Sequence, residues 1–193
     1  MDIGVTGSGK RSGTALAKRE EKMSPEQHAL KARIFAHALL ELARNRIPYD
    51  FFVSKAIWGL SLYLETGEFR QENFNRYARL SVAAKQLHSR TSIGEWKRTV
   101  RFEHCMPLRA IWQGLLDCGP ELDLQKLLGI IGAYPPIIIT REEDDRIDKK
   151  WKASGAPEDR YEGIALTCEL KSDRYVENAR RIMSLPQSLA SAG

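Results

Sequence analysis

The sequence predicts an α+β protein that is predominantly helical, with an N-terminal helical layer followed by a small half that contains a ββα arrangement. Three observations support this class. Apolar residues recur at helical spacing through the first half of the chain. An alternating stretch over 99–104 then suits a strand, and a continuous β-branched run at 137–139 suits a second, buried strand. The length of 193 residues is enough for one domain with its own core.

Four regions follow from composition and pattern. They are a flexible basic tail, a helical region, an α+β region that holds the candidate ββα site, and a frayed C-terminus, over 1–22, 23–92, 93–185 and 186–193. The tail contains the spacing of a phosphate-binding loop between Gly4 and Lys10. Only a very short stretch precedes this string, where such a loop needs a central strand, so a basic tail is the preferred interpretation.

Capping residues place the helices of the first half. Ser24 and Gln27 form a capping box at the start of the first helix. Asp50 can cap a second helix, which should end near Gly67. A third helix is expected over 70–88, where apolar residues again recur at helical spacing.

In the second half, short helices separate the two expected strands. A second capping box, formed by Thr140 and Glu143, opens the helix that follows the second strand. The elements expected besides the two strands are two short helices, the capped helix, a further strand and an amphipathic tail helix, over 107–119, 121–131, 141–152, 164–166 and 173–183.

Composition narrows the function classes. Hydrophobic residues make up 42% and charged residues 28%, as in soluble globular proteins. No apolar stretch approaches the roughly 20 residues needed to cross a bilayer, so no membrane association is expected. The three cysteines are widely spaced and predict neither a disulfide framework nor a zinc site, which favours a reducing, cytoplasmic location. The net charge of +5 favours a polyanionic partner such as nucleic acid.

The distribution of charge is more informative than its total. Basic residues gather over 85–101, and acidic residues gather over 142–148. One interpretation is a pair of solvated faces; the other is a phosphate-binding approach beside a cation site. The candidate nucleic-acid contacts in the basic run are Lys97, Arg98 and Arg101. Trp96 in the same run is interpreted as a packing residue, with stacking on a base as the alternative.

Glu103 and His104 are the strongest candidates for chemistry. A histidine at a strand end can deprotonate water, and an adjacent carboxylate can hold a divalent metal. Neighbouring side chains on a regular strand point to opposite faces, so one shared site requires the strand to end or bulge there, and Pro107 favours such an ending. The alternative is a half-buried structural histidine beside a surface glutamate.

The order of Glu103, His104 and Pro107, then a strand, then a carboxylate-bearing helix, resembles the His-Me finger nucleases of the HNH superfamily. The resemblance covers residues 98–152. It implies a metal ligand at Glu103, a general base at His104 and a further metal ligand from the helix over 141–152, for which the candidates are Glu143 and Asp144. The family usually carries an Asn and a His in the second half of its motif, and this chain has neither residue type between positions 105 and 175.

The sequence therefore predicts a metal-dependent, HNH-like endonuclease that hydrolyses nucleic-acid phosphodiesters with Mg²⁺ or Mn²⁺, the cations that hard oxygen ligands favour. The alternative is a non-catalytic helical accessory or regulatory protein, of a phage or plasmid type, that binds nucleic acid or a protein partner. The nuclease requires Glu103, His104 and a carboxylate of 141–148 to converge. An imidazole buried in apolar packing, away from those acids, favours the binding protein.

Overall fold

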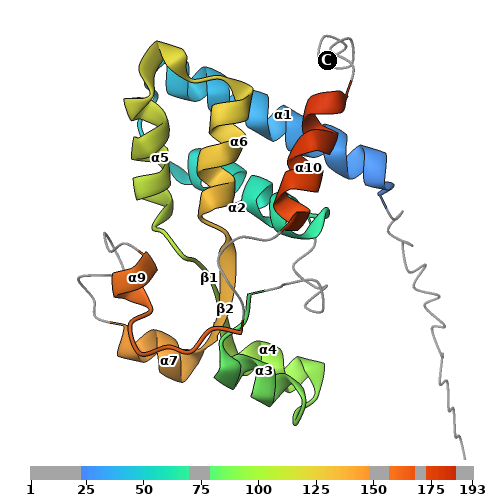
Figure 1. Ribbon diagram of the computed structural model, residues 1–193, viewed down its shortest axis with the longest axis vertical. Helices are drawn as coiled ribbons and strands as arrows, with labels where there is room; N and C mark the ends of the chain where they lie inside the picture. Colours follow the sequence, from blue (N-terminus) through green and yellow to red (C-terminus); the bar gives the residue numbers. More distant parts are fainter. Residues whose placement is uncertain (1–22, 70–78, 148–156, 168–172, 186–193) are drawn as a thin grey trace, which may run out of the picture.

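The computed structural model describes residues 23–69, 79–147, 157–167 and 173–185 (Figure 1). It confirms the predicted class, because helices predominate and the described strands form one small antiparallel sheet. The upper part of the molecule in Figure 1 is a layer of helices, and the lower part holds the sheet with short helices around it. The predicted tail with its Gly4–Lys10 string and the predicted C-terminus lie outside the described residues.

Five helices build the upper layer: α1, α2, α5, α6 and α10, over Pro25–Arg44, Phe51–Thr66, Leu108–Asp117, Leu124–Ala133 and Asp173–Ser184. Their buried apolar residues form the largest core cluster, in which Trp112 and Leu39 are almost fully buried. The layer is therefore not confined to the N-terminal region, since α5, α6 and α10 all contact α1 or α2.

The helix ends follow the predicted capping chemistry. The Ser24 side chain accepts the Gln27 backbone N–H, and the Gln27 side chain accepts the Ser24 N–H, so the capping box is confirmed. Asp50 Oδ1 accepts the Val53 N–H at 2.8 Å. Gly67 ends α2 in the left-handed region at φ 74°, which a residue with a Cβ adopts only with strain.

The lower part is organised by β1 (Val100–His104) and β2 (Pro136–Thr140), which pair antiparallel from Val100 opposite Thr140 to His104 opposite Pro136. The other elements here are α3, α4, α7 and α9, over Val82–His88, Ile93–Thr99, Arg141–Arg146 and Pro157–Arg160, and the short helix η2 (Gly119–Glu121) joins α5 to α6 in the upper layer. A bridge from Leu80 to Ile138 covers one edge of β2, so β1 is the outer strand among the described residues.

Several expected boundaries were wrong. The helix expected over 70–88 begins at Val82 in its described part, with residues 70–78 outside the description. The strand expected at 164–166 is only an isolated bridge between Leu166 and Ser81. The helix expected over 141–152 ends at Arg146, because Ile147 turns to extended backbone and is buried.

Helix α4 was not predicted. Its N-cap is Ser92, whose side chain accepts the Glu95 N–H. A serine followed three residues later by an acid is a recognisable signal for the start of a helix. The helix was missed because it is too short to show a helical repeat of apolar residues. In the described part of the chain, no helix is both long and apolar enough to cross a membrane.

Candidate functional site

Strand β1 separates the two residues on which the nuclease prediction depends. The strand ends at His104, as Pro107 led us to expect, but it stays in register to this residue, which lies opposite Pro136, and forms no bulge. Side chains therefore alternate along it. Arg101 and Glu103 face α7, where both approach Asp144, whereas His104 lies against Trp58 of α2.

His104 is enclosed in aromatic packing. Its ring lies edge-on to the ring of Trp58, with centroids 4.6 Å apart, and only 6% of the residue is exposed. Its buried Nε2 has no hydrogen-bond partner among the described residues. Burial, with a smaller contribution from the Arg160 guanidinium, lowers the pKa of His104 to about 3. The imidazole is neutral at physiological pH and is a weak base.

Glu103 belongs to a cluster of alternating charges. Arg160 of α9 donates from Nη2 to Glu103 Oε2 at 2.8 Å, and Arg101 Nε lies 3.8 Å from Asp144 Oδ2. Burial raises the pKa of Glu103, the neighbouring Asp144 carboxylate raises it further, and Arg160 acts in the opposite direction. The fold therefore brings together one predicted ligand from β1 and one from α7, with an arginine beside each.

Glu143 is occupied by the structure of the helix start. Its Oε2 accepts the Thr140 N–H at 2.8 Å and the Ser81 hydroxyl at 2.5 Å, and Thr140 Oγ1 accepts the Glu143 N–H at 3.0 Å. The predicted capping box is confirmed, and the additional bond from Ser81 ties α3 to α7. Because its carboxylate already accepts these buried donors, Glu143 is not oriented for a metal shared with Glu103.

The residues that best suit a divalent cation are thus Glu103 and Asp144. In the described ranges no set of three or more His, Cys, Asp or Glu side chains is arranged to hold a metal. Mg²⁺ can be held by two carboxylates when water and substrate phosphate complete its coordination. A cation at this point would compete with Arg101 and Arg160 for the same oxygens.

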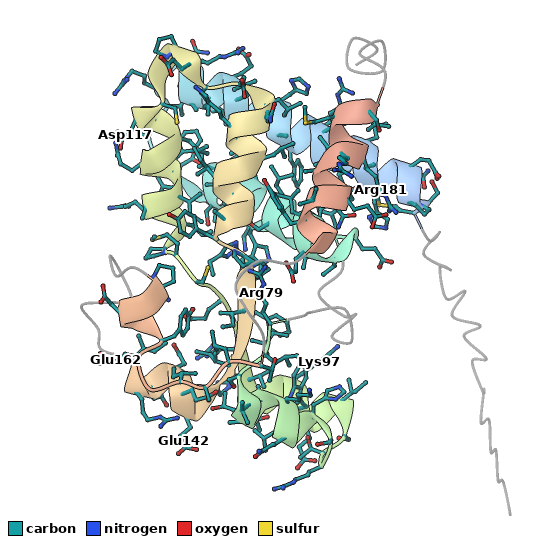
Figure 2. All side chains as sticks on the ribbon, in the orientation of Figure 1. Arg79, Lys97, Asp117, Glu142, Glu162 and Arg181 are labelled. Atoms are coloured by element: carbon teal, nitrogen blue, oxygen red, sulfur yellow. The ribbon has the colours of Figure 1, made fainter. Side chains whose placement is uncertain are left out.

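A second site lies among α3, α4 and α7, at the lower end of the molecule where Figure 2 labels Lys97 and Glu142. A cavity of about 610 Å³ opens there, and four arginines from these elements and the α3–α4 turn contribute to its lining: Arg90, Arg98, Arg141 and Arg146. All four are exposed. Within the described part of the chain their side chains make no hydrogen bond or ion pair, so their guanidinium groups remain available to a ligand.

The predicted nucleic-acid contacts divide between these two sites. Arg98 lies at the arginine-lined cavity, and Lys97 is exposed beside it on α4. Arg101 is on the β1 face that meets Asp144. It therefore belongs to the carboxylate cluster, which consists of Glu103, Asp144 and the two arginines beside them, Arg101 and Arg160. Residues that the sequence did not single out for these sites are Arg141, Arg146 and Arg160. Arg141 and Arg146 flank the four acids of 142–145, so the segment was interpreted as acidic and its two arginines were not considered as phosphate contacts.

Comparisons of the chain with protein-family models, with curated proteins and with solved structures found no match. What each site can bind therefore follows from its own residues.

Proposed function

We propose that this chain is a cytoplasmic nucleic-acid-binding protein that holds a phosphodiester backbone at the arginine-lined cavity. The observation that carries the proposal is the gathering of Arg90, Arg98, Arg141 and Arg146 around one cavity without intramolecular partners in the described residues. A guanidinium group is planar and always charged, and it binds phosphate oxygens in pairs. Glu142 is the exposed acid at this cavity, since Glu143 is buried in its cap, so cations outnumber acids there.

The environment of His104 favours binding over catalysis. A general base works best when its pKa lies near the working pH. The pKa of His104 is lowered to about 3, and its ring packs against Trp58 on the side of β1 opposite to Arg101 and Glu103. This arrangement suits a buried structural histidine better than a general base that activates water.

The first test is a double substitution, Arg98→Gln with Arg141→Gln. Each arginine that meets a phosphate releases a counterion, so the variant should weaken binding most at low salt. We expect affinity for a labelled DNA duplex or single strand to fall by roughly 10- to 100-fold, and the slope of log K against log salt to decrease by about 2 units. Fluorescence anisotropy over a range of salt concentrations measures both.

The matched control is Arg180→Gln with Arg181→Gln, which removes two exposed positive charges from α10, at the other end of the molecule (Figure 2). It has the same net charge as the test variant. Equal losses of affinity in the two variants would mean that only total charge matters, and the cavity would then have no special role. No binding by the wild-type protein would end the proposal.

Metal-dependent hydrolysis is the second candidate, and the contact between Glu103 and Asp144 favours it. A divalent cation in such a site neutralises charge on the phosphate. We expect Asp144→Asn to abolish any Mg²⁺- or Mn²⁺-dependent cutting of supercoiled plasmid or single-stranded RNA, and EDTA to abolish it in the wild type. His104→Ala tests the predicted base. Cutting that persists in Asp144→Asn would remove the carboxylate pair from the reaction, and no cutting by the wild type would leave the binding proposal alone.

A further inference from the structure

We infer that a second cavity, along the outer edge of β1, binds a single nucleotide, with the base between aromatic side chains and the phosphate on Arg109. The cavity measures about 500 Å³, which is within the usual range for small-molecule sites. It lies where the helical layer meets the sheet, and its lining comes from α2, β1, α5, α9 and the α1–α2 turn. Sites of this kind favour such junctions between parts of a fold.

Three aromatic residues line this cavity: Tyr49, Trp58 and Phe102. Trp58 has a fixed orientation because the buried ring of His104 meets it edge-on. His104 is neutral at physiological pH, so it places no charge against the indole. Stacking on aromatic side chains is the general way in which proteins hold an unpaired base.

Arg109 supplies the positive charge. Its guanidinium lies over the Tyr49 ring, 5.5 Å from the ring centroid, and the residue is exposed. Among the described residues, its side chain has no other hydrogen-bond or ion-pair partner. The other arginine of the cavity, Arg160, is already bonded to Glu103. Arg109 is therefore the guanidinium available to a ligand phosphate, and Tyr49 holds it beside the aromatic surface.

The backbone at the end of β1 is already engaged. Of the described strands, β1 pairs only with β2, and its residues Phe102, Glu103 and His104 line the cavity. The His104 C=O accepts the Tyr161 hydroxyl at 3.3 Å. Recognition at this cavity therefore comes from side chains. A ring for stacking and a cation for phosphate together match a nucleotide.

Binding of a free nucleotide here does not depend on the arginine-lined cavity. Only binding of a nucleotide within a nucleic-acid strand rests on the proposed function. Isothermal titration calorimetry with adenosine 5′-monophosphate and with adenosine tests it. We expect Arg109→Gln to weaken binding of the monophosphate by roughly tenfold and to leave adenosine unchanged, since a charged hydrogen bond contributes about that factor. Trp58→Leu should weaken both ligands, and Arg98→Gln, at the other cavity, should change neither.

A short adenine oligonucleotide separates the two sources of the ligand. Tighter binding of the oligonucleotide than of the monophosphate, with the same sensitivity to Arg109→Gln, identifies an unpaired nucleotide of a strand. Binding of the monophosphate alone identifies a free nucleotide. No binding of the monophosphate at millimolar concentration, or binding that Arg109→Gln leaves unchanged, overturns the inference. Either of these results leaves the Arg98 and Arg141 experiment untouched, so the two proposals fail separately.

Discussion

Replacing Trp96 by alanine should lower the free energy of unfolding by about 3–5 kcal/mol, the usual cost of removing a large buried aromatic side chain. Trp96 is fully buried among Leu62, Ala84 and Ile138, and its indole N–H donates to the Ala84 carbonyl at 2.8 Å. The alanine variant leaves a cavity and removes the indole donor from the Ala84 carbonyl. Urea unfolding followed by circular dichroism measures the change.

Trp96→Phe is the control, because it keeps an aromatic ring and loses only the N–H donor and part of the volume. We expect it to cost less than half as much as alanine. A loss of nucleic-acid affinity in the phenylalanine variant, at unchanged stability, would contradict the packing role and revive base stacking by this residue. The preferred interpretation from sequence, packing, agrees with the burial observed.

Acid should destabilise the protein through His104. The folded pKa is about 3 and the ordinary value is 6.5. Between these values the unfolded chain binds more protons than the folded one, so stability rises with pH. The contribution of the neutral imidazole is complete above pH 6.5 and decreases as the pH falls toward 3. At pH 4.5, two units below the unfolded value, about 3 kcal/mol of it is lost.

The measurement compares wild type with His104→Gln by urea unfolding at several pH values. Glu103 must be allowed for, because its raised pKa has the opposite sign and adds stability as the pH falls. The difference between the two proteins removes that common contribution. We expect the wild-type advantage to decrease by about 3 kcal/mol from pH 7 to pH 4.5. Ile182→Val, a buried apolar change in α10, should show a difference that does not vary with pH. A parallel pair of curves for wild type and His104→Gln would contradict the burial of a neutral imidazole.

The parts of the fold that sequence predicted are those set by local chemistry. Ser24, Asp50 and Thr140 each cap a helix through a bond to a residue only three positions away, so the signal lies within a few letters. The run 137–139 predicted β2 because a continuous β-branched run is best interpreted as a buried strand. The placement of α5 and α6 in the upper layer was not predictable in this way, since it depends on contacts with α1 and α2 far away in the chain.

The candidate site divides in the same manner. The carboxylates of Glu103 and Asp144 were found by type and by their place at a strand and a helix start, and the fold brings them into contact. The sequence also placed Glu143 and His104 in this site, which the structure does not support. The residues that hold these side chains elsewhere, Ser81 and Trp58, are distant in sequence and could not be identified from local pattern. Arg160 was missed for the same reason, because only the position of α9 places it beside Glu103.

The two strands of the sheet are not a hairpin, since α5, η2 and α6 occupy the chain between His104 and Pro136. Because these helices dock on α1 and α2, the ends of the strands are brought together by the assembly of the upper layer. We therefore expect the lower part to fold after the upper part. The carboxylate cluster and the arginine-lined cavity, which both use α7, would then be completed late, and we expect substitutions that destabilise the distant helical layer to disturb them.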